Sequence, residues 1–110
     1  MTSIDPSLAA LGDPARRRIV QLLAAGPLPV HAIQENFSFS QPALSKHLRV
    51  LRDAGLVAFE KKGRAHHYAL NGHVIRDAAS WLLELYEFWN TNLDELSNVL
   101  DSMAEAEENA

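Results

Sequence analysis

The sequence of 110 residues contains no cysteine. A chain without thiols can form neither a disulfide framework nor a thiolate metal site, and it cannot sense redox state through cysteine oxidation. The sequence also lacks a run of about 20 uncharged apolar residues and a basic-then-apolar leader at its N-terminus. We therefore expect a cytoplasmic globular protein that makes no contact with a membrane and needs no cofactor.

Positive charge is scarce in the last third of the chain. Residues 73–110 hold a single cation, Arg76, and carry a net charge of −8, whereas residues 1–72 carry a net charge of +4. Six of the ten Lys and Arg residues lie between Lys46 and Arg64. Because a local positive field attracts nucleic-acid phosphates, the overall net charge of −4 does not exclude DNA binding.

The segment 40–55 is predicted to be a helix, called here the reading helix. Ser40 or Gln41 can cap its N-terminus, Pro42 is tolerated in the first turn, and Gly55 fits a left-handed stop. Helical spacing places one set of side chains on a face predicted to be core: Ala43, Leu44, His47, Leu48, Val50, Leu51 and Ala54. The opposite face carries amide, hydroxyl and cationic groups of the kind that contact base edges and phosphates, although a solvated helix can look the same. On the core face, His47 is most simply a hydrogen-bonded histidine rather than a metal ligand.

The segments on either side of the reading helix favour DNA recognition. A short helix over 31–36 and a tight connection precede it, which is the helix-turn-helix arrangement. After it, residues 56–60 and 65–70 have the period of two strands, joined at Lys62-Gly63. Lysines in a plain hairpin can simply discourage edge pairing, but three cations on a turn after a helix-turn-helix favour a wing that contacts DNA.

Two Asp-Pro pairs upstream predict two helix starts, at Asp5-Pro6 and at Asp13-Pro14. The first helix is expected to be short, over 7–11. The second carries a core-facing stripe that includes Ile19 and Leu23. Its first turns hold Arg16, Arg17 and Arg18, which we expect to be solvated or to approach DNA phosphates.

The C-terminal segment from His73 onward is predicted to be one long helix, capped by Asn71 or Gly72 and weakened at 90–92. Apolar residues recur along it in steps of four and three, a pattern typical of helix association: Ile75, Ala79, Leu82, Tyr86, Trp89, Leu93, Leu96, Leu100 and Met103. A second apolar stripe lies beside this seam: Val74, Ala78, Trp81, Leu85 and Phe88. We predict that the seam forms a dimer interface together with Leu8 and Leu11 of the first helix, the alternative being burial of both stripes in one monomer.

Several motifs occur in order over roughly residues 8–100: Leu11-Gly12-Asp13-Pro14 with Arg16 to Arg18, Ser40-Gln41-Pro42-Ala43-Leu44-Ser45-Lys46-His47-Leu48, Leu51, and Ala54-Gly55-Leu56-Val57. Together they resemble the ArsR family of small bacterial winged-helix repressors. The resemblance implies a homodimeric repressor that binds an inverted repeat, usually near its own gene, and is released by a signal. It implies that Gln41, Ser45 and Lys46 face the major groove and that Arg49 and Arg52 face the backbone. The complete set of predicted DNA-binding residues is Ser40, Gln41, Pro42, Ser45, Lys46, Arg49, Arg52, Lys61, Lys62 and Arg64.

Many members of that family sense a metal, but the ligands are missing from this sequence. The family's cysteine pair ahead of the reading helix is absent, and nothing after Asp77 completes a nitrogen-containing site on the last helix. His66 and His67 are adjacent on a strand and point to opposite faces. We therefore predict no metal site. The Trp and Tyr spacing of the last helix resembles that of the metal-free branch of the family. Trp81, Tyr86 and Trp89 could instead be plain core or line a site for a small-molecule or protein effector.

These observations predict a mostly α fold with a small β-hairpin wing, a winged helix-turn-helix that dimerises through its terminal helices. One domain, 1–110, would comprise a DNA-binding core over 12–72, a dimerisation helix over 73–103 and a frayed acidic tail over 104–110. No nucleophile with a paired base, phosphate loop or carboxylate pair indicates an enzyme. The alternative is a protein-interaction module that keeps this fold and uses its long helix without binding DNA. Such a module has no need for cations in the reading helix and the wing.

Overall fold

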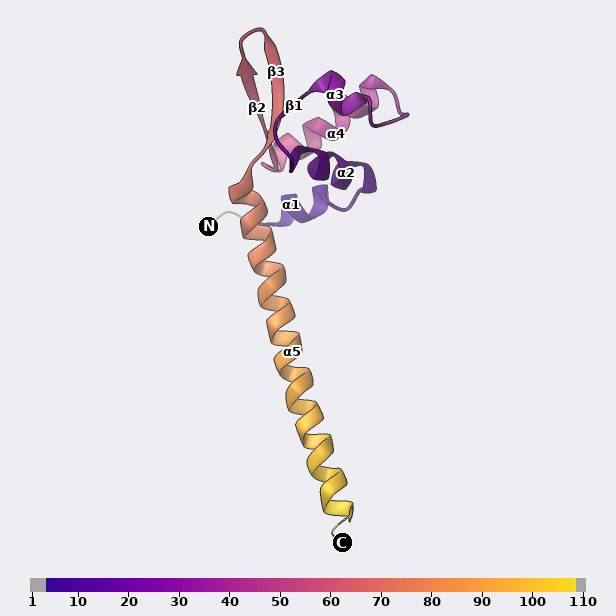
Figure 1. Cartoon of the computed structure of the whole chain (residues 1–110), viewed down its shortest axis with the longest axis vertical. Helices are drawn as coiled ribbons and strands as arrows, with labels where there is room; N and C mark the ends of the chain where they lie inside the picture. The colour runs from indigo at the N-terminus through magenta and orange to yellow at the C-terminus, as the bar shows by residue number, and fades with distance from the viewer. Residues whose placement is uncertain (1–3, 109–110) are drawn as a thin grey trace. The chain divides into compact units, whose positions relative to one another are not determined.

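The computed structural model describes residues 4–108 of the chain (Figure 1). The chain forms two compact units that meet between Ala78 and Ala79, within its last helix. The elements in chain order are α1 (Asp5–Ala10), α2 (Pro14–Leu23), β1 (Leu28–Pro29), α3 (Val30–Gln34), α4 (Gln41–Asp53), β2 (Val57–Lys62), β3 (Ala65–Leu70) and α5 (Gly72–Glu108). The predicted fold class, mostly α with a small β wing, is confirmed.

The core of the first unit comes from the apolar faces of its helices. Ile19 of α2, Ile33 of α3 and Leu44 of α4 are fully buried. They pack in one cluster with Leu48 and Leu51 of α4, and each such side chain contributes about 1.5–3 kcal/mol by leaving water. The core is therefore built around the inner face of α4, which leaves the outer face of that helix free for solvent or a ligand.

The reading helix is confirmed as α4, with the ends that its local sequence predicts. The Ser40 hydroxyl accepts a hydrogen bond from the Ala43 amide at 3.3 Å, and Gly55 takes the left-handed conformation, with φ of +78°. One core assignment is wrong, because Val50 is 39% exposed. Val50 lies about 120° around the helix from Leu44, so it falls at the edge of the apolar face.

The hairpin pairs β2 with β3 in antiparallel register, with Phe59 opposite Tyr68 and Lys61 opposite His66. The predicted turn was wrong by one residue: Lys62 pairs with Ala65, which leaves Gly63 and Arg64 as the turn. Gly63, with φ of +62°, occupies the position where a tight hairpin turn needs a positive φ, and only glycine adopts it without strain. The two-residue strand β1 pairs with the other edge of β3, giving the order β1-β3-β2.

Two short helices differ from their predicted bounds. α1 spans Asp5–Ala10 instead of 7–11, because Asp5 lies within the first turn and Ile4 stands at the N-cap. α3 spans Val30–Gln34 instead of 31–36, and Pro29 precedes it with an extended backbone. Helix boundaries shift easily by one or two residues where no side-chain cap fixes them, and neither helix has a side-chain N-cap.

α5 runs without interruption from Gly72 to Glu108, and Asn71 Oδ1 accepts a hydrogen bond from the His73 amide at 3.2 Å. The predicted weakening at 90–92 is absent, and the tail is helical as far as Glu108 rather than frayed from 104. The composition Ala-Glu-Ala-Glu-Glu explains the extension, because alanine and glutamate both favour helix. Residues 109–110 of the predicted tail lie outside the described part. No helix in the described residues is long and apolar enough to cross a membrane.

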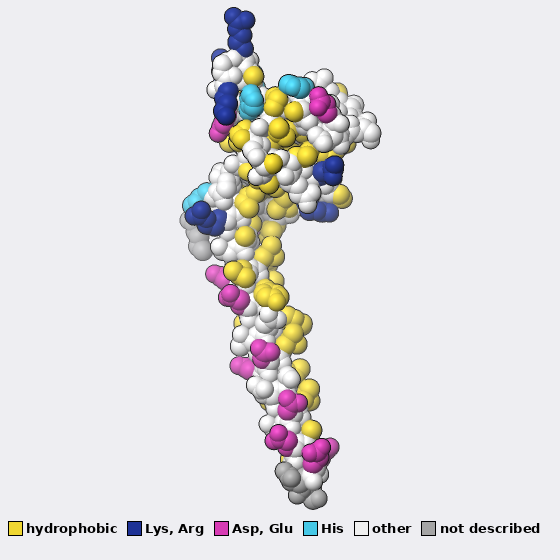
Figure 2. Space-filling model, in the orientation of Figure 1, with side chains coloured by type: hydrophobic (Ala, Val, Ile, Leu, Met, Phe, Trp, Pro, Cys, Tyr) yellow, Lys and Arg dark blue, Asp and Glu magenta, His cyan; other side chains and the backbone are white. Residues whose placement is uncertain are grey.

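Apolar side chains remain uncovered along the part of α5 that belongs to the second unit. In Figure 2, hydrophobic side chains follow one side of this helix and acidic side chains follow the other. Most seam residues are more than half exposed, for example Leu82 at 51%, Tyr86 at 60% and Leu96 at 54%. Ala79 is exposed as well, whereas Ile75 is half-buried and packs against the core of the first unit. Both stripes are therefore exposed within the second unit, whereas their first members, Val74, Ile75 and Ala78, are buried or half-buried in the first unit.

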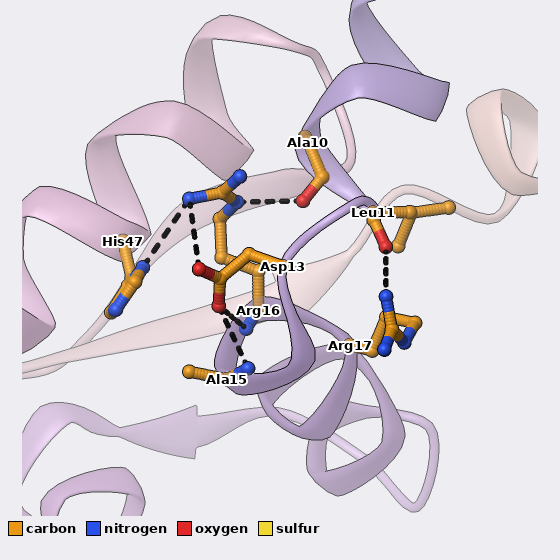
Figure 3. Close-up of polar contacts among 7 residues, drawn as sticks. All are labelled: Ala10, Leu11, Asp13, Ala15, Arg16, Arg17 and His47. Atoms are coloured by element: carbon orange, nitrogen blue, oxygen red, sulfur yellow. Dashed lines mark hydrogen bonds and ion pairs between the residues drawn. The ribbon is translucent and has the colours of Figure 1, made fainter.

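Asp13 caps α2, as predicted. Its Oδ1 accepts hydrogen bonds from the amides of Ala15 at 2.8 Å and Arg16 at 3.3 Å (Figure 3). Desolvation acts to raise the pKa of Asp13, but the two amide hydrogen bonds and the Arg16 charge outweigh it, so the pKa lies below its ordinary value. The charged carboxylate therefore stabilises the fold.

Asp13→Asn keeps the capping oxygen and removes the charge. Because the pKa of Asp13 is lowered by folding, its contribution is present at neutral pH and is lost as the pH falls below about 4. We expect the melting temperature of Asp13→Asn to lie below that of the wild type at pH 7, and the two values to converge in acid. Thermal unfolding followed by circular dichroism from pH 7 to pH 3 tests this. A difference that stays constant over that range would contradict it.

Candidate nucleic-acid interface

The ten residues predicted to bind DNA are all exposed. They form two groups within the first unit. Seven lie on α4 or at its N-cap, from Ser40 to Arg52, and point away from the leucines that α4 buries. The other three, Lys61, Lys62 and Arg64, lie at the tip of the hairpin. Figure 2 shows Lys and Arg side chains at this tip.

A cation–π contact links α4 to β2, the first strand of the hairpin. The guanidinium of Arg52, in the last turn of α4, lies 5.2 Å from the ring centroid of Phe59 on β2. The ring accepts no N–H hydrogen bond of ordinary strength, so the guanidinium keeps donors for other acceptors. The contact therefore orients one of the predicted backbone-binding cations and ties α4 to the first strand of the wing.

Phe59 is itself held by two rings from β3. His66 stacks on it with ring centroids 4.6 Å apart, and Tyr68 meets it edge to face at 5.0 Å. The register explains this cluster, because Phe59 pairs with Tyr68 and His66 lies two residues nearer the tip on the same face. Phe59 remains 40% exposed. An aromatic patch thus lies on the sheet beside α4.

A hollow of about 480 Å³ lies between α4 and the sheet. Its lining is mostly polar and includes two arginines: Ser45, Arg49, Arg52, Asp53 and Tyr68. Three of these residues were predicted from the sequence to face DNA. The structure thus brings a hydroxyl and two cations of α4 to one concave surface, where an anionic group can contact more than one of them.

Phe59, His66 and Tyr68 were not among the site residues predicted from the sequence. The alternation of side chains along the two strands could have placed all three on one face, because cross-strand pairs follow from the position of the turn. His66 and His67 point to opposite sides of the sheet, as predicted from their adjacency. The ring of His66 is stacked on that of Phe59. Among residues 4–108, no three His, Asp or Glu side chains gather in a group that could hold a metal ion.

Phe59→Leu removes the ring that orients Arg52 and keeps an apolar residue in the strand. Exposed cation–π contacts are worth about 0.5–1 kcal/mol, so we expect the affinity for DNA to fall about two- to fivefold. Phe59→Tyr keeps the ring and should bind as the wild type does. Fluorescence anisotropy with a labelled duplex measures both variants, and equal affinity of Phe59→Leu and the wild type would show that Arg52 needs no support from the ring.

Comparison with known proteins identifies the family. A family model described as bacterial regulatory protein, arsR family, matches residues 13–58, which include α2, α3 and α4. The transcriptional repressor SdpR of Bacillus subtilis is 38% identical over 74 residues, which cover 67% of this chain and 82% of that protein. The chain belongs to the ArsR family.

Further relatives extend the ArsR assignment beyond the matched core. An HTH-type transcriptional regulator of Mycobacterium tuberculosis is 36% identical over 100 residues, which cover 91% of each chain. The structure of an ArsR-like transcriptional regulator from Rhodococcus superposes with a TM-score of 0.73 at 26% identity, and the match covers 87% of this chain and 91% of that one. This ArsR-family protein is therefore a DNA-binding transcriptional regulator with a winged helix-turn-helix fold, and not an enzyme.

Proposed function

We propose that this ArsR-family regulator is a cytoplasmic homodimeric repressor that binds an inverted-repeat operator and responds to a signal other than a metal. The observation that carries the proposal is the concentration of exposed cations on the outer face of α4 and at the wing tip, in a chain whose net charge is negative. These cations would neutralise phosphates, whereas the acidic second unit would stay away from DNA.

Each group of exposed residues has a role in this proposal. Gln41, Ser45 and Lys46 would enter the major groove, where amide, hydroxyl and ammonium groups can discriminate base edges. Arg49 and Arg52 would contact the phosphates on the flank of that groove, in line with their place at the polar hollow. Ser40 and Pro42 would place the N-terminal end of α4 against the sugar–phosphate backbone of the DNA. The wing residues Lys61, Lys62 and Arg64 would contact the backbone or the minor groove.

The uncovered seam of α5 supports dimerisation. Monomeric soluble proteins rarely expose a continuous apolar surface of this kind, and the seam repeats in the steps of four and three that let two helices pack. The interface would be formed by one set of residues from each protomer: Leu8, Leu11, Ile75, Ala79, Leu82, Tyr86, Trp89, Leu93, Leu96 and Leu100. Within one chain, Leu11 and Ile75 already pack partly against the core, so they would border the interface.

An effector site at the seam, which would include Tyr86 and Trp89 with Trp81 next to them, would receive the signal. Trp81 is 46% exposed, and Tyr86 and Trp89 are each 60% exposed, so none of the three is buried core in a single chain. Their rings offer flat apolar surface with hydrogen-bonding groups at the edge, which suits a small aromatic molecule or a partner protein. This chain offers no thiolate ligands, since it has no cysteine.

Selection of bound fragments from the source genome by the purified protein tests the proposal. We would repeat the selection with a chelator and with added zinc. Recovery of one inverted repeat in all three conditions, bound by two protomers, is the expected result. Enrichment that depends on zinc would overturn the metal-independent part, and the absence of any enriched sequence would favour the protein-interaction module.

A further inference from the structure

The side chain of Arg16 connects three separate segments of the first unit. It lies in the first turn of α2, and its side chain is only 18% exposed. Its Nε donates to the carbonyl of Ala10, the last residue of α1, at 2.6 Å. Its Nη1 lies 3.9 Å from Oδ2 of Asp13 and 3.5 Å from Nδ1 of His47, which belongs to α4 (Figure 3). The prediction that this arginine is solvated is wrong, because its side chain lies mostly against other protein atoms.

The contact with His47 reaches the part of α4 that would read bases. His47 lies next to Lys46 and two residues from Ser45 in the sequence, but it faces inward and is half-buried. Because arginine has only donors, a hydrogen bond between the two side chains requires His47 Nδ1 to act as the acceptor. The same ring lies 5.4 Å from that of Phe39, which stacks on Phe37 at 4.6 Å. His47 therefore connects Arg16 to the turn at Phe37 and Phe39, which precedes α4.

Arg17 provides a natural comparison within the same turn. Its Nη1 donates to the carbonyl of Leu11 at 2.8 Å, so it also satisfies a carbonyl at the C-terminal end of α1. Arg17 is exposed, and this hydrogen bond does not extend to α4. Arg16 and Arg17 thus both donate a hydrogen bond to a carbonyl at the end of α1. Of the two, only Arg16 also contacts α4, the reading helix. A purely local capping role does not account for that second contact.

We propose that Arg16 is a positioning residue that sets the angle of α4 relative to α1, and so sets the half-site spacing that the dimer accepts. The inference rests on the proposed function, in which α1 contributes Leu8 and Leu11 to the dimer interface. In a two-fold dimer, the separation of the two reading helices depends on how each is fixed to the elements at the interface. The Arg16 guanidinium is hydrogen-bonded to the end of α1 and contacts His47 on the inner face of α4. It therefore fixes the position of α4 relative to α1.

The test compares Arg16→Met with Arg17→Met on duplexes that carry the selected operator with its half-sites at the selected spacing or moved by one base pair either way. Each added base pair rotates one half-site by about 34° around the DNA axis. We expect the wild type and Arg17→Met to prefer the selected spacing by about tenfold, and Arg16→Met to prefer it by about twofold or less. Affinity for an isolated half-site should stay within about twofold for all three proteins.

His47→Leu keeps the test available if Arg16→Met does not fold. This variant leaves the hydrogen bond from Arg16 to Ala10 in place and removes the contact of Arg16 with α4, together with the ring contact between His47 and Phe39, so it should also lose the spacing preference. Wild-type preference for the selected spacing in Arg16→Met, or in His47→Leu if Arg16→Met does not fold, would overturn the proposal even if the melting temperature falls. A wild type that selects no operator would overturn the proposed function and the role of Arg16 with it.

Discussion

Replacing Lys46, Arg49, Lys61, Lys62 and Arg64 together by Ala should abolish specific DNA binding and leave the fold intact. All five side chains are exposed, and their substitution changes no buried contact. Surface substitutions of this kind usually alter stability by less than about 0.5 kcal/mol each. Because each of these cations can neutralise a phosphate, their removal from both protomers should lower the affinity at physiological salt by at least about a thousandfold.

Affinity measured over a series of salt concentrations separates charge from sequence readout. Arg49→Ala alone should weaken all sequences and reduce the slope of log affinity against log salt by about 0.9 for each phosphate that Arg49 neutralises in the wild type. Ser45→Ala should change the preference among bases at one operator position and leave the slope unaltered. Arg18→Ala with Arg76→Ala is the matched control, because it removes two exposed cations outside α4 and the wing. If that control weakened binding as much as the five-residue variant does, net charge rather than the interface would govern binding.

The elements with strong local signals could be predicted from the sequence. Ser40, Pro42 and Gly55 mark the two ends of α4 by their own chemistry, so its bounds needed no knowledge of the rest of the fold. The hairpin was predictable from its alternation, but Gly63 can serve either position of a tight turn, so the register remained open by one residue. α1 and α3 have no side-chain N-cap, and their observed bounds differ from the predicted ones by one or two residues at each end.

The contacts that organise the candidate site join residues that belong to different elements. Arg16 and His47 are 31 residues apart, and nothing in the local pattern of either residue indicates the other. Arg52 and Phe59 are close in the sequence, but they belong to different elements, so their contact also depends on how α4 packs against β2. A sequence pattern gives the face on which a side chain lies, whereas its partner depends on how the elements pack. The chemistry of the surface was therefore predictable, and the network that supports it was not.

Leu82→Glu should convert the protein from a dimer to a monomer. Leu82 lies on the seam of α5 and is 51% exposed in the single chain, so the substitution disturbs no core. In the dimer, each protomer would bury one unpaired carboxylate, and an uncompensated buried charge costs about 3–5 kcal/mol. The dissociation constant of the dimer should rise by at least about a hundredfold.

Leu83→Glu is the matched control for this substitution. Leu83 is adjacent, is 55% exposed and lies outside both apolar stripes, so the variant has the same charge and the same removal of an exposed leucine from the helix. Sedimentation at micromolar concentration should show a monomer for Leu82→Glu and a dimer for the wild type and Leu83→Glu. A dimeric Leu82→Glu would place the interface on the second stripe, which contains Trp81, Leu85 and Phe88, and Leu85→Glu would then be the dissociating variant. A monomeric wild type would exclude the seam as an interface between copies of this chain, and the exposed apolar side chains of α5 would then have to meet a different protein.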